Sequence, residues 1–393
     1  MENQKLLKPA VIFDIEDELS TNTRNRVLVS VHIADLHFPN AIEPAKQYEI
    51  LNEQFLCKIS SLPRLDAIFI NGDLFDHKVL VSSDAAYYAS LFVAQVVEIA
   101  KMKNATVIIL HGTLSHDANQ LKLYYHYMHN PNVDVRIVTN IKFEIIKGAK
   151  VLCIPELYGV SEEIYDEFLY KQGTYDLCVM HGTYNGAVYG NNVGNGRCFY
   201  QSDFNNCKGP VVAGHVHTPN CFDGFFYYCG SPYAWNFADD HDKSYIILLQ
   251  NLDTRHYYVY RDEIKSFVYR TFDIEDLIKG DPKATIDYIE NLKSKYGIDY
   301  IRIRFNSILN GSTKLIINNY FRNNPNYKIE FNTAESEMIK RQEQEIKSEL
   351  DGFEFILDPK MSEEEKFVMY INKIRGEEYI TVDELRSILN EKI

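Results

Sequence analysis

The sequence predicts an α/β protein in which two packed β-sheets are flanked by helices. Short runs of apolar, β-prone residues recur through the first two thirds of the chain, as expected for strands buried on both faces. A long apolar stretch at 84–103 separates two of these runs and is long enough for a packed helix. Later strand-like runs follow one another without long helices, which predicts a second, more antiparallel sheet packed on the first.

The expected strands fall into two sets. Alternation with helix-like stretches indicates a layered sheet from the runs at 27–34, 67–71, 106–111, 150–154, 176–180 and 210–214. The second sheet would take the runs at 224–229, 244–249 and 256–260. These elements define a predicted first domain at 1–264.

The pattern changes near residue 265. Helix-like and strand-like stretches then alternate at 284–296, 299–305, 313–322 and 327–332. They predict a small α+β domain at 265–332, in which alternation places Arg302 and Arg304 on one face of a strand. These arginines could contact phosphates, and an ordinary solvated face is the favoured alternative.

The last predicted part is 333–393, which begins with a charged, helix-prone segment at 333–350. Two short helices follow, and both start with a capping-box pattern: Ser362 with Glu365, and Thr381 with Glu384. Each carries an apolar stripe, formed by Phe367, Ile371 and Ile374 and by Leu385, Ile388 and Leu389. Short helices need a surface on which to bury such stripes, either this protein's own core or a partner.

The composition narrows the classes of function. The formal net charge of −14 argues against a protein that coats nucleic acid by bulk electrostatics, but not against contacts through metal ions and a local basic strip. The seven cysteines form no CxxC pair, which indicates reduced thiols and no zinc site. With no run of about 18 apolar residues and no secretory signal, we expect a cytoplasmic protein without a membrane span.

Five short motifs place an Asp or His at the ends of predicted strands: ADLH at 34–37, NGDLFD at 71–76, GTLSHD at 112–117, MHG at 180–182 and GHVH at 214–217. Open α/β sheets build their sites at the carboxyl ends of strands. Carboxylates can bridge two divalent ions, and imidazoles favour manganese, iron or zinc. A lone histidine or a single Gly-Asp turn would be unremarkable, but the ordered set predicts a two-metal site that acts on phosphoryl groups.

This ordered set resembles the calcineurin-like metallophosphoesterase superfamily and, within it, the SbcD-type DNA nucleases. The resemblance covers residues 26–262 and includes YYCGSP at 227–232, followed by Lys243. It implies a two-sheet metallophosphoesterase fold, two divalent ions with manganese favoured over magnesium, and a ligand set in which Asp73 bridges both ions. The first ion would be bound by Asp35, His37 and His217, and the second by His181 and His215.

The GTLSHD motif carries the predicted catalytic pair and a departure from the family pattern. The resemblance makes His116 the non-ligand histidine beside the scissile phosphate, and Asp117 could orient its imidazole. The family usually has Gly-Asn-His, with the Asn as a ligand of the second ion. Here Ser115 occupies that place and would be a weaker ligand, unless a water or Asn119 fills the gap.

The resemblance also implies a role for the rest of the chain. The domain at 265–332 would cap DNA, a purely stabilising domain being the alternative. The C-terminal helices would bind the coiled-coil base of an SbcC-type, SMC-like ATPase, since the chain has no GxxxxGK[ST] loop of its own. The resemblance also implies a homodimer. Abundant Asn, Ile, Lys and Tyr suit an A·T-rich genome such as that of a phage, in which case the protein would work in the host cytoplasm.

Three functions remain open from the sequence. The leading hypothesis is a metal-dependent DNA nuclease, a duplex exonuclease and single-strand endonuclease that serves DNA repair, recombination or replication in an SbcC–SbcD-type complex. The second is a phosphoesterase of the same chemistry acting on small phosphodiesters or phosphoproteins. The third is a non-catalytic scaffold of a recombination complex whose site has decayed at Ser115.

Overall fold

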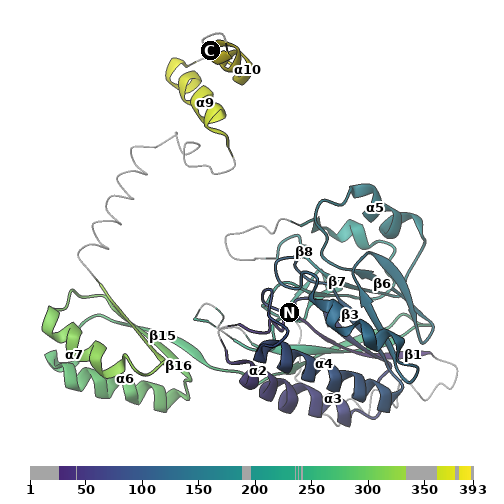
Figure 1. Cartoon of the computed structure of the whole chain (residues 1–393), viewed down its shortest axis with the longest axis horizontal. Helices are drawn as coiled ribbons and strands as arrows, with labels where there is room; N and C mark the ends of the chain where they lie inside the picture. Colours follow the sequence, from purple (N-terminus) through teal and green to yellow (C-terminus); the bar gives the residue numbers. More distant parts are fainter. Residues whose placement is uncertain are drawn as a thin grey trace. The chain divides into compact units, whose positions relative to one another are not determined.

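The computed structural model describes residues 26–40, 42–187, 196–234, 236–237, 239, 242–332, 361–376 and 380–390. In these residues the chain is an α/β protein with two six-stranded mixed sheets flanked by helices, a smaller three-stranded sheet and C-terminal helices (Figure 1). The predicted fold class is confirmed. The contacts of the chain divide it into two units, Met1–Thr271 with Asn291–Arg302, and Phe272–Glu290 with Ile303–Ile393.

The first sheet has the strand order β14-β13-β1-β2-β3-β4. Its strands are β1 (Val27–Ile33), β2 (Ala67–Asn71), β3 (Thr106–Leu110), β4 (Asp134–Val138), β13 (Ser244–Asn251) and β14 (Tyr257–Glu263). The strands β1 to β4 are parallel, whereas β13 runs antiparallel to β1 and β14 antiparallel to β13. All four residues of β1 that alternate from Val27 to Ile33 join the core beneath the helices.

The second sheet has the order β11-β12-β10-β7-β6-β5. Its strands are β5 (Lys142–Ile146), β6 (Ala149–Ile154), β7 (Leu177–His181), β10 (Val211–Gly214), β11 (Asn220–Phe222) and β12 (Phe226–Tyr228). Its four inner strands are parallel, and only the outer strands β5 and β11 are antiparallel to their neighbours. A short pair, β8 (Thr183–Tyr184) with β9 (Cys198–Phe199), lies apart from both large sheets.

The assignment of strands to sheets differs from the prediction. The runs at 150–154, 176–180 and 210–214 form the second sheet, and the runs at 244–249 and 256–260 extend the first. The reason is the pairing of β13 with β1, in which Val27 lies opposite Asn251 and His32 opposite Ile246. All eight residues of β13 are buried, as expected for a strand paired on both edges and covered on both faces.

Helices cover both outer faces of the pair of sheets (Figure 1). On the first sheet lie α2 (Pro44–Leu51), η1 (Asn52–Leu56), α3 (Cys57–Ser61) and α4 (Asp84–Lys103), whose apolar side chains share one core with β1. On the second lie α5 (Glu162–Asp166), η3 (Glu167–Lys171) and η4 (Gln201–Phe204). A separate core, with Leu28 and Phe69 from one sheet and Val151 and Val179 from the other, fills the space between the sheets. The helix predicted at 84–103 is confirmed.

Local capping interactions fix both ends of helix α4. The Ser83 hydroxyl accepts a hydrogen bond from the Ala86 N–H at the start, and Asn104 takes the left-handed conformation at the end. Between β3 and β4 the chain forms η2 (Gln120–His129).

The smaller sheet has the order β15-β16-β17, with strands β15 (Tyr269–Ile274), β16 (Tyr300–Phe305) and β17 (Tyr327–Phe331). The helices η5 (Ile278–Gly280), α6 (Pro282–Tyr296) and α7 (Gly311–Phe321) alternate with these strands, close to the predicted pattern. Both arginines of β16 have intramolecular contacts, because Arg302 donates to Thr271 and stacks over Phe237 while Arg304 pairs with Glu330. These contacts favour the alternative in which the two arginines lie on an ordinary solvated face of the strand.

The last helices are α9 (Glu363–Arg375) and α10 (Val382–Asn390). Both predicted capping boxes are confirmed by reciprocal hydrogen bonds, Ser362 with Glu365 and Thr381 with Glu384. The Asn372 side chain holds the two helices together, since it donates to the Ile380 carbonyl and accepts from its N–H. The charged segment predicted at 333–350 lies outside the described residues. Among the helices that the structure describes, none has the length and apolar character needed to cross a membrane.

The buried His32 predicts a loss of stability in acid. Its ring stacks on Phe69 with a centroid distance of 4.5 Å, and burial lowers the pKa of His32 to about 3. The folded protein therefore keeps this imidazole neutral, while the unfolded chain takes up a proton below about pH 6.5. From this residue we expect a loss of about 2 kcal/mol between pH 7 and pH 5.

Urea unfolding at several pH values, compared with a His32→Gln variant, measures this contribution. The variant should be less stable at pH 8 and should show a shallower decline toward pH 5. Parallel declines in the two proteins would contradict a buried neutral His32.

Candidate metal centre

The predicted site residues meet at the carboxyl ends of strands from both large sheets. Asp35 and His37 follow β1, Asp73 follows β2, His181 ends β7, and His215 follows β10. Because the inner strands of each sheet are parallel, their carboxyl ends share one edge. The packing of the sheets then brings the two edges together, with Asp35, His37, Asp73, His181 and His215 buried.

The loops at these strand ends hold their ligands in an unusual backbone conformation. Asp35, His37, Asp73 and His215 all have positive φ, at 55°, 49°, 50° and 94°. Non-glycine residues rarely adopt this region, and such strain is found where the surrounding structure enforces it, often at functional sites. At Gly72, with φ of 91°, an added Cβ would lie 2.2 Å from His181 Nδ1, so only glycine permits this approach.

The first group of converging side chains is Asp35, His37 and His217, whose ligand atoms lie within 4.8 Å of one another. The Nε2 atoms of His37 and His217 are 3.2 Å apart. Asp35 accepts hydrogen bonds from the His215 N–H at 2.9 and 3.2 Å, which fixes the carboxylate at the centre of the site. This is the set that the resemblance implied for the first ion.

The Asp73 carboxylate lies between the two histidine groups. Its Oδ2 is 3.7 Å from His37 Nε2 and 3.2 Å from His181 Nε2. The Thr113 backbone N–H donates to Oδ1 at 2.6 Å, and the Thr113 hydroxyl oxygen lies 3.2 Å from Oδ2. A carboxylate oxygen placed in this way could contact an ion in either group.

The second group is Glu156, His181 and His215, all buried and again within 4.8 Å of one another. Glu156 was not among the predicted residues. Glu156 lies two residues after the end of β6, just as Asp35 lies two residues after the end of β1. A carboxylate after a predicted strand was therefore the one sequence signal for Glu156. No histidine or glycine beside it marked a motif.

The structure differs from the prediction at Ser115. That residue is exposed, and the side chain that reaches the site from this loop belongs to Thr113. The physical reason is a tight turn in which the N–H groups of His116 and Asp117 both donate to the Thr113 carbonyl. Leu114 and Ser115 form the outside of this turn, and Asn119 is also exposed. We therefore do not retain Ser115 as a ligand.

Asp117 also differs from its predicted role. Its buried carboxylate accepts hydrogen bonds from the backbone N–H groups of Gly112, Asp73 and Phe75, and so ties together the loops after β2 and β3. The imidazole of His116 is instead held by a contact between its Nδ1 and the Asp76 carbonyl. A carbonyl only accepts, so Nδ1 carries the proton and Nε2 is left for other chemistry. The His116 ring centre is 4.7 Å from that of His37, which places it beside the first group.

The electrostatics of the cluster favour a positive charge at its centre. Burial would lower the pKa of His181, but the charges of Asp73, Asp35 and Glu156 outweigh it and raise that pKa to about 10. Burial raises the pKa of Asp35 to about 6. For Glu156 burial is outweighed by the hydrogen bond with His215 and the charge of His181, so its pKa falls to about 2. Bound cations satisfy the same demand for positive charge.

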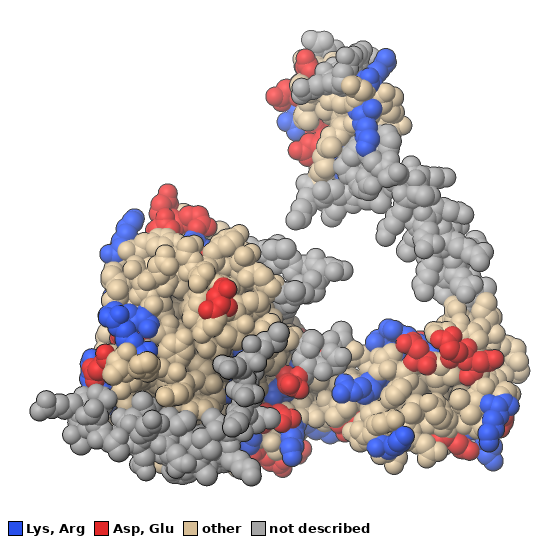
Figure 2. Space-filling view, turned by 180° about the vertical axis from the view of Figure 1, so that it is seen from behind, with Lys and Arg blue, Asp and Glu red and all other residues tan. Residues whose placement is uncertain are grey.

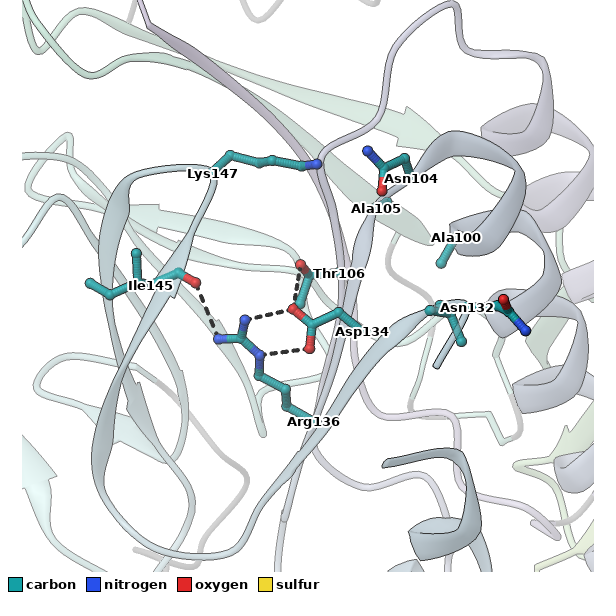
Figure 3. Close-up of a pocket in the computed structure, with 10 residues that line it drawn as sticks. Ala100, Asn104, Ala105, Thr106, Asn132, Asp134, Arg136, Ile145 and Lys147 are labelled. Carbon is teal, nitrogen blue, oxygen red and sulfur yellow. Dashed lines mark hydrogen bonds and ion pairs between the residues drawn. The ribbon is translucent and has the colours of Figure 1, made fainter. Parts of the chain in front are cut away.

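A surface hollow of about 240 Å³ lies elsewhere, between the α4 end and the strands β3 to β5 (Figure 3). Its guanidinium, on Arg136, is paired with Asp134 and Glu144. These ion pairs already use the charge that an anionic ligand would need. The hollow contains none of the predicted site residues.

Comparisons with known proteins add little to this geometry. No protein-family model matches the sequence, and no curated protein matches it. A solved crystal structure aligns over 99% of its own length and 61% of this chain, with 10% identity and a TM-score of 0.35. The two mixed sheets and the buried His and Asp clusters are consistent with a calcineurin-like fold. The clusters are groups of buried side chains that could hold metal ions.

Metal binding should release protons and weaken as the pH falls. In the metal-free protein His181 keeps its proton up to about pH 10, and Asp35 gains one as the pH falls through about 6. Both groups must be deprotonated to bind an ion. We expect the Mn²⁺ affinity to fall by roughly tenfold per pH unit between pH 8 and pH 6.

Calorimetric titration in two buffers of different ionisation enthalpy measures the protons released. An apparent enthalpy that is the same in both buffers, together with a pH-independent affinity, would contradict this description of the site.

Proposed function

We propose that this protein is a metal-dependent DNA nuclease and the nuclease subunit of an SbcC–SbcD-type complex. One observation carries the proposal: the Asp73 carboxylate lies between two buried histidine groups, 3.7 Å from His37 Nε2 and 3.2 Å from His181 Nε2, and His116 stands beside the first group. The ordered motifs of the sequence support the same chemistry. Manganese is the expected ion, with magnesium as the alternative.

Two divalent ions in these positions would polarise the phosphodiester and supply a hydroxide nucleophile. Asp35, His37 and His217 would hold the first ion, and His181 and His215 the second, while Asp73 would contact both. In its doubly protonated form, with one proton held on Nδ1 by the Asp76 carbonyl, His116 would stabilise the developing charge or give its second proton, from Nε2, to the leaving oxygen. Asp117 would act on the loops and not on the substrate.

DNA is favoured over a small substrate by the parts of the chain beyond the site. The domain at 265–332 and the C-terminal helices are not needed to hydrolyse a small phosphodiester, and we propose that the domain caps DNA. On the face shown in Figure 2, Lys and Arg of the described residues are interspersed with Asp and Glu and form no continuous basic surface. With a net charge of −14, DNA contacts would depend on the bound ions and on local groups.

The helix pair supports a partner. Phe367 and Ile374 on α9 are 50% and 56% exposed, and Ile388 on α10 is 49% exposed. Short helices with such exposed apolar side chains gain stability by burying them. We propose that an SbcC-type ATPase covers them with its coiled-coil base. A homodimer is proposed from the resemblance.

Replacing His116 should slow cleavage strongly without abolishing metal binding. We expect His116→Ala to lower Mn²⁺-dependent cleavage of a duplex with a single-stranded tail by about 10²–10⁴-fold, the usual contribution of a general acid. The exposed His126 provides a matched control, and His126→Ala should cleave at the wild-type rate.

The outcomes separate the three functions. Loss of DNA cleavage in the variant supports the nuclease. Wild-type protein that hydrolyses a small phosphodiester but not DNA, even with a cognate ATPase, would favour the small-substrate phosphoesterase. Inactivity toward both would favour the scaffold.

A charge on α9 should weaken the partner interaction. We expect Phe367→Asp to reduce binding of an SbcC-type coiled-coil fragment by at least about tenfold, because a buried interface side chain would become an unpaired charge. Cleavage by the protein alone should be unchanged. The control is Leu80→Asp, at a residue that is 76% exposed on a loop of the large unit. Equal binding by wild type and Phe367→Asp would exclude this face as the docking site.

A further inference from the structure

We infer that Glu156 is a direct ligand of the second metal ion, so that both ions are bound by the same kinds of side chain. The inference rests on the proposed function, because it concerns the ion pair of that site. It assigns a role to a residue that belongs to none of the sequence motifs, and it replaces Ser115 as the fourth ligand of the second position.

The geometry places one oxygen of Glu156 at the second position. Its Oε2 lies 3.7 Å from His181 Nε2 and 3.4 Å from His215 Nδ1. The carboxylate is held from two sides, since the Thr113 hydroxyl donates to Oε2 at 2.9 Å and the Tyr158 hydroxyl donates to Oε1 at 2.6 Å. Supporting contacts of this kind fix the orientation of ligands around metal ions.

The orientation of His181 directs its Nε2 toward the two carboxylates. Its Nδ1 lies 2.7 Å from the Asn71 carbonyl, which can only accept, so Nδ1 carries the ring proton. Its Nε2 therefore faces Asp73 at 3.2 Å and Glu156 at 3.7 Å. Two buried carboxylates and one imidazole nitrogen converge on one point, where a positive charge stabilises both carboxylates. A divalent ion at this point would bond to all three.

The burial of three carboxylates also favours positive charge at this site. The residues Asp35, Asp73 and Glu156 are 0%, 2% and 6% exposed, and buried carboxylates are costly unless they are paired or bound to metal ions. A pair of divalent ions carries more positive charge than these three carboxylates carry negative charge. With one carboxylate fewer, the pair would be less well neutralised.

The two positions then become equivalent in ligand type. Each shares Asp73, and each adds one carboxylate and two imidazoles: Asp35, His37 and His217 at the first, and Glu156, His181 and His215 at the second. Thr113, directly after Gly112, donates to Asp73 through its backbone N–H and to Glu156 through its hydroxyl, and so orients the two carboxylates of the second position. A carboxylate is a stronger ligand for manganese or magnesium than a neutral hydroxyl, so the second ion should be bound about as tightly as the first.

The test is the stoichiometry of Mn²⁺ binding, measured by calorimetry and by electron paramagnetic resonance of coupled Mn²⁺ pairs. Wild-type protein should bind two ions and show a coupled pair. Glu156→Gln, which keeps the shape and removes the charge, should bind one ion as before, weaken the other by at least about tenfold and lose the coupled signal. Glu156→Asp should weaken the same ion to a smaller degree.

Glu144→Gln is the matched control, because Glu144 is also poorly exposed but pairs with Arg136 and Lys142 on the strands β4 and β5. It should bind two ions with wild-type affinity. Melting temperatures of the metal-free variants report folding independently of metal. If both Glu156 variants bound two ions as tightly as wild type, the inference would be overturned and the proposed function would stand. If wild-type protein bound fewer than two ions, both would fail.

Discussion

The position of the Asp73 carboxylate between two groups of histidines is the constraint on which the rest of the site depends. One oxygen of this side chain lies within 3.7 Å of both His37 and His181, which come from different sheets. This approach exists only because the carboxyl ends of β1 and β2 in the first sheet face those of β7 and β10 in the second. The apolar core between the sheets therefore fixes the geometry of a polar cluster at its edge.

The loops at this edge are held more tightly than ordinary connections. Four cluster residues have positive φ, and Asp117 ties two of the loops together through three backbone N–H groups. Strain of this kind persists only when the surrounding packing enforces it. As a result, the carboxylates and imidazoles are already oriented before ions bind, so that metal binding requires little rearrangement.

The sequence predicted nine of the twelve strands of the two large sheets, because buried strands and the residues that end them have strong local signals, but it did not predict β4, β5 or β11. It could not predict which sheet β13 would join, since that depends on long-range pairing of Val27 with Asn251. Nor could it predict that Thr113 and not Ser115 would face the site, because the turn after Gly112 sets that direction. Glu156 lacked a neighbouring motif, and the role we infer for it depends on the pairing of β6 and β10 with β7, which brings it close to His181 and His215.

The central claim is that two divalent ions bind on either side of Asp73. Diffraction from crystals soaked in manganese, collected at the manganese absorption edge, tests it most directly. The account predicts two anomalous peaks about 3.5–4 Å apart, one beside His37 and His217 and one beside His181 and His215. A single peak, or peaks away from Asp73, would contradict it.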